Sequence, residues 1–213
     1  MTPREEYYET LAKSLIPRMK KRNFEACYCK TKEEAFKKAL SYFKEGDSIG
    51  WGGSMTLEEI GLMDYLRTKE HGYVIYDRDT ATTPEEKKAM YGKIATCDYF
   101  LMSSNAITLD GELVNIDGNG NRVACLCHGP EHVIVIAGLN KVVKTETDAY
   151  DRVRNTAAPL NGCRLNTKTP CHVTGSCADC KSPDSMCCQL VTTRLSRGKG
   201  RIKVILVGES LGY

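Results

Sequence analysis

The 213-residue chain has no long apolar segment, and none of its stretches comes near the roughly 18 apolar residues of a membrane-spanning helix. The N-terminal residues MTPREEYYETLAKSL are charged and lack the apolar run of a secretory signal peptide. The net charge of +3 is too small to predict nucleic-acid binding, which needs a concentrated basic face. We therefore expect a cytoplasmic protein with no membrane span and no nucleic-acid partner.

Cysteine, in contrast, is abundant, with 11 residues of this type in the chain. In the cytoplasm, glutathione and thioredoxin keep thiols reduced, so structural disulfides do not account for these cysteines. Five of them fall within the stretch PCHVTGSCADCKSPDSMCC, residues 170–188. This stretch is the first place to look for a metal or redox site.

The first half of the chain alternates short apolar runs with amphipathic helical patterns. Such alternation predicts parallel strands that are joined by crossover helices. The predicted helices cover residues 4–22, 31–45, 56–69 and 84–95, and the predicted strands cover 48–51, 73–77 and 98–103.

The second half of the chain has a different pattern. Asp-Gly and Asn-Gly turn signals separate β-rich runs in residues 106–129, which predicts antiparallel hairpins. The continuous apolar run HVIVIAG, residues 132–138, is typical of a central strand that is covered on both faces. A helix is expected over 147–158, a cysteine-rich insertion over 163–188, and a final core strand over 201–208.

The glycine-rich turn in residues 50–61 lies between a predicted strand and a predicted helix. Gly52 and Gly53 allow close approach of the backbone to a ligand, and Thr56 begins the pattern of a helix capping box. The helix start supplies free amides and partial positive charge, so a small anion would bind there, with Ser54 and Thr56 as hydroxyl donors. The alternative interpretation is a tight, well-capped turn without a ligand.

Polar residues also follow two predicted strands directly, where ligands bind in open α/β sheets. Asn105 and Thr108 follow the strand that ends at 103, and Asn140 and Lys141 follow the strand that ends at 138. Lys141 would pair with a phosphate or carboxylate, unless it is a solvated lysine at a strand edge. Asn121 is a weaker candidate, because an Asn-Gly turn alone explains it.

An ordered series of motifs runs along nearly the whole chain: GGSMTLEEIG, SNAITLDGELVNIDGNGNRVA, GPEHVIVIAGLNKVV, NTAAPLN and CHVTGSCADCKSPDSMC. This series resembles the LUD (lactate-utilisation) domain family, in its short cysteine-rich subset. The resemblance implies a fold similar to the sugar-phosphate isomerase and CoA-transferase superfamily. That fold is a Rossmann-like three-layer α/β/α sandwich with a mostly parallel central sheet, here as one domain over 1–213 with an N-terminal helical segment, 1–45.

The resemblance also implies membership of systems that oxidise lactate to pyruvate. The expected protein is an accessory or redox subunit in the oxidation of lactate, or a related 2-hydroxy acid, to the 2-oxo acid. Its partners would be a small anionic metabolite and an iron–sulfur or flavin protein subunit. Two other functions stay open: an enzyme acting on a sugar phosphate or CoA ester, with Asp110, Glu112 or Asp117 as its carboxylate, and a metal-stapled anion-binding module without catalysis.

Four cysteines, Cys171, Cys177, Cys180 and Cys187, have the spacing C-x5-C-x2-C-x6-C. Four thiolates suit either a tetrahedral zinc ion or an iron–sulfur cluster, and this spacing matches neither a ferredoxin run nor a zinc ribbon. The resemblance favours a 4Fe–4S cluster, while zinc and metal-free thiols remain alternatives. Cys188 is expected to pack against apolar neighbours.

Overall fold

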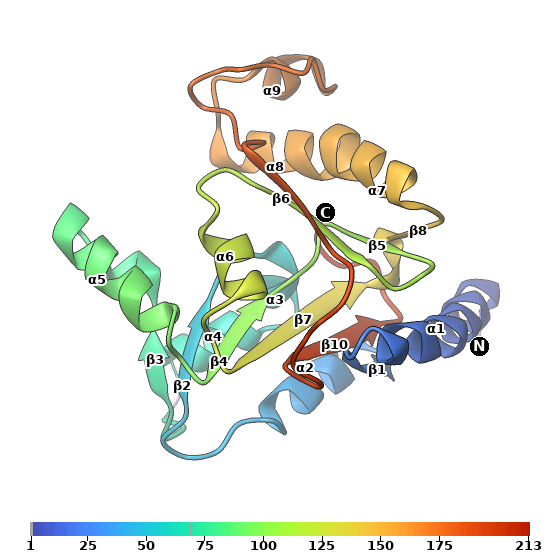
Figure 1. The fold of residues 1–213 in the computed structure, drawn as a ribbon, viewed down its shortest axis with the longest axis horizontal. Helices are drawn as coiled ribbons and strands as arrows, with labels where there is room; N and C mark the ends of the chain where they lie inside the picture. The colour runs from blue at the N-terminus through green and yellow to red at the C-terminus, as the bar shows by residue number, and fades with distance from the viewer. Residues whose placement is uncertain (1, 69) are drawn as a thin grey trace.

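The computed structural model describes residues 2–68 and 70–213, so Met1 and Lys69, at the ends of two predicted segments, lie outside the described residues. Six parallel strands form the central sheet in the order β1-β10-β7-β4-β2-β3 (Figure 1). These strands are β1 (Glu25–Cys29), β2 (Ser48–Trp51), β3 (Val74–Tyr76), β4 (Tyr99–Met102), β7 (His132–Gly138) and β10 (Ile202–Val207).

Helices cover both faces of this sheet. In β7, Val133 and Val135 pack into one buried cluster while Ile134 and Ile136 pack into the other, because successive side chains of a strand point to opposite faces. The predicted α/β fold class is therefore confirmed, with a parallel central sheet between two helical layers. One layer contains α1 (Pro3–Lys21), α5 (Pro84–Ile94) and α6 (Asn121–Cys127), and the other contains α2 (Lys32–Leu40), α3 (Met55–Glu59) and α4 (Leu62–Thr68).

A second, four-stranded sheet has the order β8-β5-β6-β9, and β5 and β6 form an antiparallel hairpin. The alanines and valines of one helical segment pack on this sheet and cover it. Its strands are β5 (Ala106–Thr108), β6 (Leu113–Asp117), β8 (Val142–Val143) and β9 (Gln189–Thr193). The helical segment consists of α7 (Glu146–Arg152), a π-helical turn (Val153–Ala157) and α8 (Ala158–Leu165), and α9 (Pro170–Thr174) lies beyond it at the top of Figure 1.

The prediction of hairpins over 106–129 is wrong beyond residue 117, because α6 replaces the second hairpin. Gly120 adopts a left-handed backbone, with φ at 79°, at the start of this helix and not in a hairpin turn. Val123 and Leu126, spaced three apart, are buried on one face of α6, as in an amphipathic helix. An Asn-Gly pair marks a chain reversal, but it does not decide whether a strand or a helix comes after the turn.

Three predicted helices have different limits in the structure. The helix expected over 31–45 ends at Leu40, well before Gly46. The helix expected over 56–69 is divided at Gly61, whose φ of +75° is outside the helical region. The helix expected over 147–158 starts at Glu146 and runs on through the π-helical turn to Leu165.

Three strands, β1, β8 and β9, were not predicted. β1 lies in the gap between the helices predicted over 4–22 and 31–45, within the segment 1–45 that was expected to be helical. β10, in contrast, lies inside the predicted final core strand. Across residues 2–68 and 70–213, no helix combines the length and the apolar character that crossing a bilayer requires.

Candidate functional site

A cavity of about 200 Å³ lies just beyond the carboxyl ends of β2, β4 and β7. We call it the polar cavity; its lining includes Gly53, Ser54, Arg78, Ser103, Asn105, Asp117, Asn121, Arg122, Lys141 and Arg164. Five of the nine predicted binding residues are in that set, namely Gly53, Ser54, Asn105, Asn121 and Lys141. The rule that ligands bind beyond the carboxyl ends of strands therefore located a real cavity.

Lys141 is the most deeply buried charged residue of the polar cavity, with 2% of its surface exposed. It lies directly after β7, and its Nζ donates hydrogen bonds to the hydroxyl oxygens of Thr56 and Ser103, at 2.9 Å each. Burial, together with the charges of Arg152 and Arg122, lowers the pKa of Lys141 to about 7. Near neutral pH, this amine therefore exists in both its charged and its neutral form.

Arg122 fixes the inner wall of the polar cavity, and its side chain is only 13% exposed. Its guanidinium donates to the carbonyl oxygens of Ser103 and Ile116, at 3.2 and 2.7 Å. It also donates to the side-chain oxygens of Asn105 and Asn115, at 2.9 and 2.7 Å. Because these acceptors belong to β6 and the segment between β4 and β5, Arg122 ties the second sheet to the central sheet.

Asp117, at the end of β6, is the carboxylate that lines the polar cavity. Its Oδ1 accepts a hydrogen bond from the amide of Gly120 at 2.9 Å, and its Oδ2 lies 3.5 Å from Nε of Arg122. Oδ2 is buried and has no hydrogen-bond partner among the described residues. The other two predicted carboxylates lie elsewhere, since Asp110 is exposed and Glu112 pairs with Arg22 at 3.1 Å.

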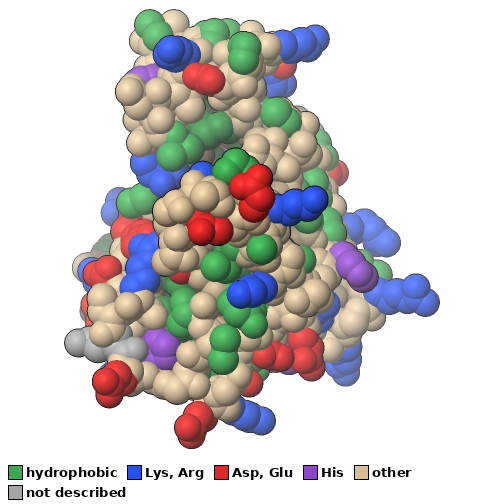
Figure 2. All heavy atoms as spheres, turned by 90° about the vertical axis from the view of Figure 1, so that its left-hand side faces the viewer, with side chains coloured by type: hydrophobic (Ala, Val, Ile, Leu, Met, Phe, Trp, Pro, Cys, Tyr) green, Lys and Arg blue, Asp and Glu red, His purple; other side chains and the backbone are tan. Residues whose placement is uncertain are grey.

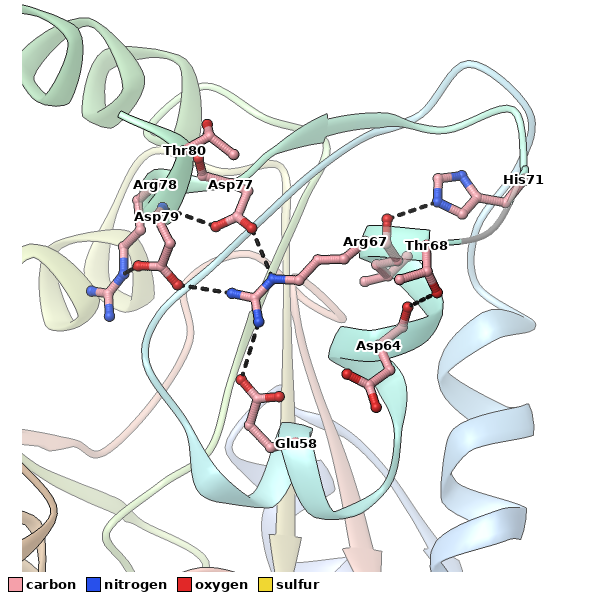
Figure 3. Close-up of polar contacts among 10 residues, drawn as sticks. Glu58, Asp64, Arg67, Thr68, His71, Asp77, Arg78, Asp79 and Thr80 are labelled. Carbon is pink, nitrogen blue, oxygen red and sulfur yellow. Dashed lines mark hydrogen bonds and ion pairs between the residues drawn. The ribbon is translucent and has the colours of Figure 1, made fainter. Parts of the chain in front are cut away.

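Arg78 reaches the rim of the polar cavity from the short helix η1 (Arg78–Thr80), which an ionic network holds in place (Figure 3). Arg67 binds the carboxylates of Asp77 and Asp79 at 2.8 Å each, and that of Glu58 at 3.5 Å. Asp77 in turn accepts a hydrogen bond from the amide of Asp79 and caps η1. Nε of Arg78 joins this network at 3.5 Å from Oδ1 of Asp79, and in Figure 3 its terminal nitrogens point away from the network.

Replacing Arg67 by methionine is expected to lower the free energy of unfolding by about 1–3 kcal/mol, because the largely buried carboxylate of Asp77 loses its ion-pair partner. Urea denaturation of both proteins measures the change. Arg197→Met, at an exposed arginine, is the matched control and should change stability by less than about 0.5 kcal/mol. Equal stabilities of the wild type and Arg67→Met would show that the network does not hold η1.

The two glycines of the predicted anion turn make room for arginine side chains. A Cβ atom on Gly53 would lie 2.8 Å from Nη2 of Arg78, and one on Gly52 would lie 3.0 Å from Cγ and Cδ of Arg122. The Gly52 amide is already bonded to the carbonyl of Leu101, so it is not free for a ligand. The glycines do allow another group to approach the backbone closely, as expected. At Gly52 that group is the side chain of Arg122 and not a ligand.

Three other predicted residues, Thr56, Thr108 and Asn140, lie outside the lining of the polar cavity and support its walls. Ser54, and not Thr56, caps α3, and the Thr56 hydroxyl instead accepts the hydrogen bond from Lys141. Thr108 is buried against Glu112, at 2.9 Å. Asn140 bonds the backbone of Leu211 and Gly212, so it holds the C-terminal segment. A ligand-binding role for the nine predicted residues stays a prediction.

Arg78, Arg122 and Ser103 were missed as cavity residues. Ser103 could have been found, because it follows β4 as directly as Asn105 does. Arg78 and Arg122 follow turn residues, and nothing in their local sequence signals a buried or rim position.

A second cavity, of about 220 Å³, is lined by all four predicted ligand cysteines, Cys171, Cys177, Cys180 and Cys187. We call it the cysteine cavity; its other lining residues are Ile116, Arg154, Ala158, Ala178, Asp179 and Leu190. In the part of the chain that the structure describes, no three Cys, His, Asp or Glu side chains are grouped closely enough to hold a metal ion as they stand. Metal binding by these cysteines therefore stays a prediction.

The chemical surroundings of the four cysteines are mixed. Arg154 donates to the Cys177 sulfur at 3.6 Å and to Asp179 at 2.6 Å, and the Asp179 amide donates to the same sulfur at 3.5 Å. Burial and the nearby Cys177, among other thiols, raise the pKa of Cys187. Cys188, which was expected to pack apolarly, is exposed.

The two cavities share a wall. Ile116 of β6 and Ala158 of α8 line both of them, and Met186 lines the polar cavity while the next residue, Cys187, lines the cysteine cavity. Figure 2 shows the molecule narrowing below the lobe that contains α8 and α9, with basic side chains gathered at this level. A group held by the cysteines would be separated from a ligand of the polar cavity by little more than single side chains.

The fold and the site define a Rossmann-like α/β domain with a cation-rich cavity at the carboxyl edge of its sheet. The family model of the LUD domain matches residues 12–207, and the chain belongs to the LUD domain family. This finding confirms the resemblance seen in the sequence. A comparison with curated proteins gave no match.

One solved structure supports the fold, and two others are similar over part of the chain. A DUF162 family protein from Deinococcus radiodurans is similar over 94% of this chain and 98% of its own, with a TM-score of 0.51 and 8% sequence identity. The δ subunit of eIF2B from Chaetomium thermophilum is 15% identical, with a TM-score of 0.34, and the match covers 68% of this chain and 55% of that one. Ribose 5-phosphate isomerase A from Methanocaldococcus jannaschii is 18% identical, also with a TM-score of 0.34, over 61% and 66% of the two chains.

Proposed function

We propose that the chain is a LUD-type redox subunit in the oxidation of lactate, or a related 2-hydroxy acid, to the 2-oxo acid. It binds the small carboxylate in the polar cavity and holds an iron–sulfur cluster on Cys171, Cys177, Cys180 and Cys187. The observation that carries this proposal is that the four cysteines line one cavity, which shares the wall of Ile116 and Ala158 with a cationic cavity.

The donor set of the cysteine cavity fits an iron–sulfur cluster. Four thiolates are the usual ligands of a 4Fe–4S cluster, and N–H groups near the sulfurs, such as the Asp179 amide, tune its potential. Zinc holds its four thiolates at about 2.3 Å from one ion. A cluster spreads its ligands further apart, as do the four cysteines that line the cavity of about 220 Å³ together with six other residues. When bound, a cluster supplies one-electron transfer.

The charges of the polar cavity suit a monocarboxylate. Arg78 and Lys141 offer positive groups, and Asp117 is an acidic residue of the same lining. Oxidation of a 2-hydroxy acid releases two electrons and two protons, more electrons than one cluster accepts at a time. An iron–sulfur or flavin protein must therefore receive the electrons, and a cytoplasmic location would keep the thiols reduced until the cluster is assembled.

Protein purified without oxygen is expected to be brown and to contain about four iron and four sulfide ions per chain. Cys180→Ala removes one ligand and should lose most of the iron, while Cys188→Ala, at the exposed neighbour of Cys187, should keep it. Iron and sulfide analysis of the three proteins measures this. A colourless anaerobic protein that contains zinc would overturn the cluster, and equal iron in all three proteins would overturn the assignment of its ligands.

Asp117 favours a second candidate function. Its Oδ2 is buried without a hydrogen-bond partner among the described residues, and it lines the polar cavity, so it could serve as the base of an enzyme acting on a sugar phosphate. Turnover of a sugar phosphate by metal-free protein would favour this function over the redox subunit.

A further inference from the structure

Lys141 is a buried amine without an acidic partner. Within residues 2–68 and 70–213, its hydrogen bonds go to two hydroxyl groups, and no carboxylate lies within ion-pair distance of its Nζ. Buried lysines are normally paired, because an unpaired buried charge is strongly unfavourable. A lysine held in this state at the floor of a ligand-sized cavity indicates a chemical role.

The hydrogen bonds around Lys141 leave the lone pair of a neutral amine unused. The Thr56 hydroxyl donates to the carbonyl of Leu211, and the Ser103 hydroxyl donates to the carbonyl of Ser104, at 3.4 Å each. Both hydroxyl oxygens therefore act as acceptors toward Nζ, and the two N–H groups of a neutral amine satisfy them. The nitrogen lone pair then has no protein donor among the described residues and is available to a ligand of the polar cavity.

The charges that surround Lys141 favour this neutral form. Burial disfavours the charged form most, and Arg152 of α7 and Arg122 of α6 repel a positive charge there. Glu59 of α3 attracts that charge, but its effect is the smallest of the four. With its pKa lowered to about 7, about half of the Lys141 side chains are neutral at pH 7. An ordinary lysine, with a pKa near 10.4, is neutral in only about one molecule in 2,500 at this pH. The neutral, nucleophilic fraction of Lys141 at pH 7 is thus about a thousand times that of an ordinary lysine.

We propose that Lys141 is a nucleophile that forms an imine with the carbonyl group of a small 2-oxo acid bound in the polar cavity. The nitrogen lone pair forms a bond to the carbonyl carbon, the carbonyl π electrons move to the oxygen, and one proton passes from the nitrogen to that oxygen to give a carbinolamine. The hydroxyl group then takes up a proton from solvent and leaves as water, and the nitrogen returns its second proton to solvent. Amine and ketone thus give imine and water, with no change of oxidation state.

The carboxylate of the 2-oxo acid would lie toward the guanidinium of Arg78, which lines the same cavity. A cavity of about 200 Å³ admits a small acid, and the excess of cationic lining selects for an anion. This activity needs only the polar cavity, and it does not depend on a cluster bound to the cysteines. Its failure and the failure of the redox proposal are therefore distinguishable.

The test uses the full chain with pyruvate and sodium cyanoborohydride at pH 7, which reduces an imine to a stable amine. Peptide mass mapping is expected to find the pyruvate adduct on Lys141 at least tenfold above that on the exposed Lys144. Labelling should rise steeply between pH 6 and 8. Lactate, which has no carbonyl group, should give no adduct, and acetone, which has no carboxylate, should label Lys141 much less than pyruvate does.

Two further variants keep the test decisive. Lys141→Arg should lose the adduct at position 141, and Lys144→Arg, at an exposed lysine, should keep the wild-type labelling of Lys141. Absence of an adduct on Lys141, or labelling no stronger than on Lys144, would overturn the proposal. Equal labelling by acetone and pyruvate would overturn the recognition of a carboxylate. Mapping of the wild-type protein decides the matter even if Lys141→Arg fails to fold.

Discussion

Replacing Arg122 by methionine is expected to lower the free energy of unfolding by about 3–5 kcal/mol. The change removes the donors that satisfy four oxygen acceptors and leaves the buried carboxylate of Asp117 without its cationic partner. Because a domain has only about 5–15 kcal/mol of net stability, a large part of it depends on this one side chain. Urea denaturation followed by circular dichroism measures the loss.

Two other variants control this experiment. Arg164→Met removes an exposed arginine whose side chain bonds the neighbouring Asn161, and it should cost less than about 0.5 kcal/mol. Arg122→Lys keeps the charge but has only three donors on one nitrogen, so it should recover little of the lost stability. A stability close to that of the wild type in either Arg122 variant would contradict the role given to the guanidinium.

Replacing Lys141 by methionine is expected to stabilise the protein at low pH. The folded-state pKa of about 7 lies below that of the unfolded chain, so the unfolded state binds the extra proton between these two values. The resulting penalty is fully present below about pH 7 and disappears as the pH rises toward the unfolded value. A shift of this size corresponds to on the order of 4–5 kcal/mol, and the lost hydrogen bonds to Thr56 and Ser103 offset about 1–3 kcal/mol of it.

The measurement is the difference in stability between Lys141→Met and the wild type, from urea denaturation at pH 6.5, 8 and 9.5 under reducing conditions. The variant should be more stable by about 2–3 kcal/mol at pH 6.5, and this advantage should shrink or reverse by pH 9.5. Lys144→Met, at an exposed lysine, should follow the wild type at every pH. A difference that does not change with pH would show that Lys141 titrates as an ordinary lysine.

The parts of the fold that depend on periodicity were predictable. The run from 132 to 138 became β7 because continuous apolar character is what a strand covered on both faces requires. β1 was missed because Glu25–Cys29 is short and mixes polar with small apolar residues, and its identity depends on parallel pairing with β10. That pairing joins residues at opposite ends of the chain, so no local window contains it.

The site was predictable where it depends on strand ends and not where it depends on long-range contacts. Lys141 was a candidate because it comes directly after β7. Arg122 was not, since its acceptors come from residues 103–116, and the sequence does not show that α6 turns it back toward them. The four cysteines line one cavity, and both their convergence on a single group and the identity of that group remain predictions.

β6 also limits where the chain can gain or lose length. Three successive residues of this strand serve different neighbours: Asn115 and Asp117 contact Arg122, and Ile116 packs under α8. Deleting one residue from the β5–β6 hairpin would turn each of these side chains to the other face of the strand. Asn115 and Asp117 would then face α8, and Ile116 would face the guanidinium of Arg122. The pairing of β6 with β9 fixes the far end of the cysteine segment, so that segment can grow or shrink as a loop. Single-residue indels in the hairpin should therefore unfold the protein, whereas indels between α9 and β9 should leave the fold intact and change only the spacing of the cysteines.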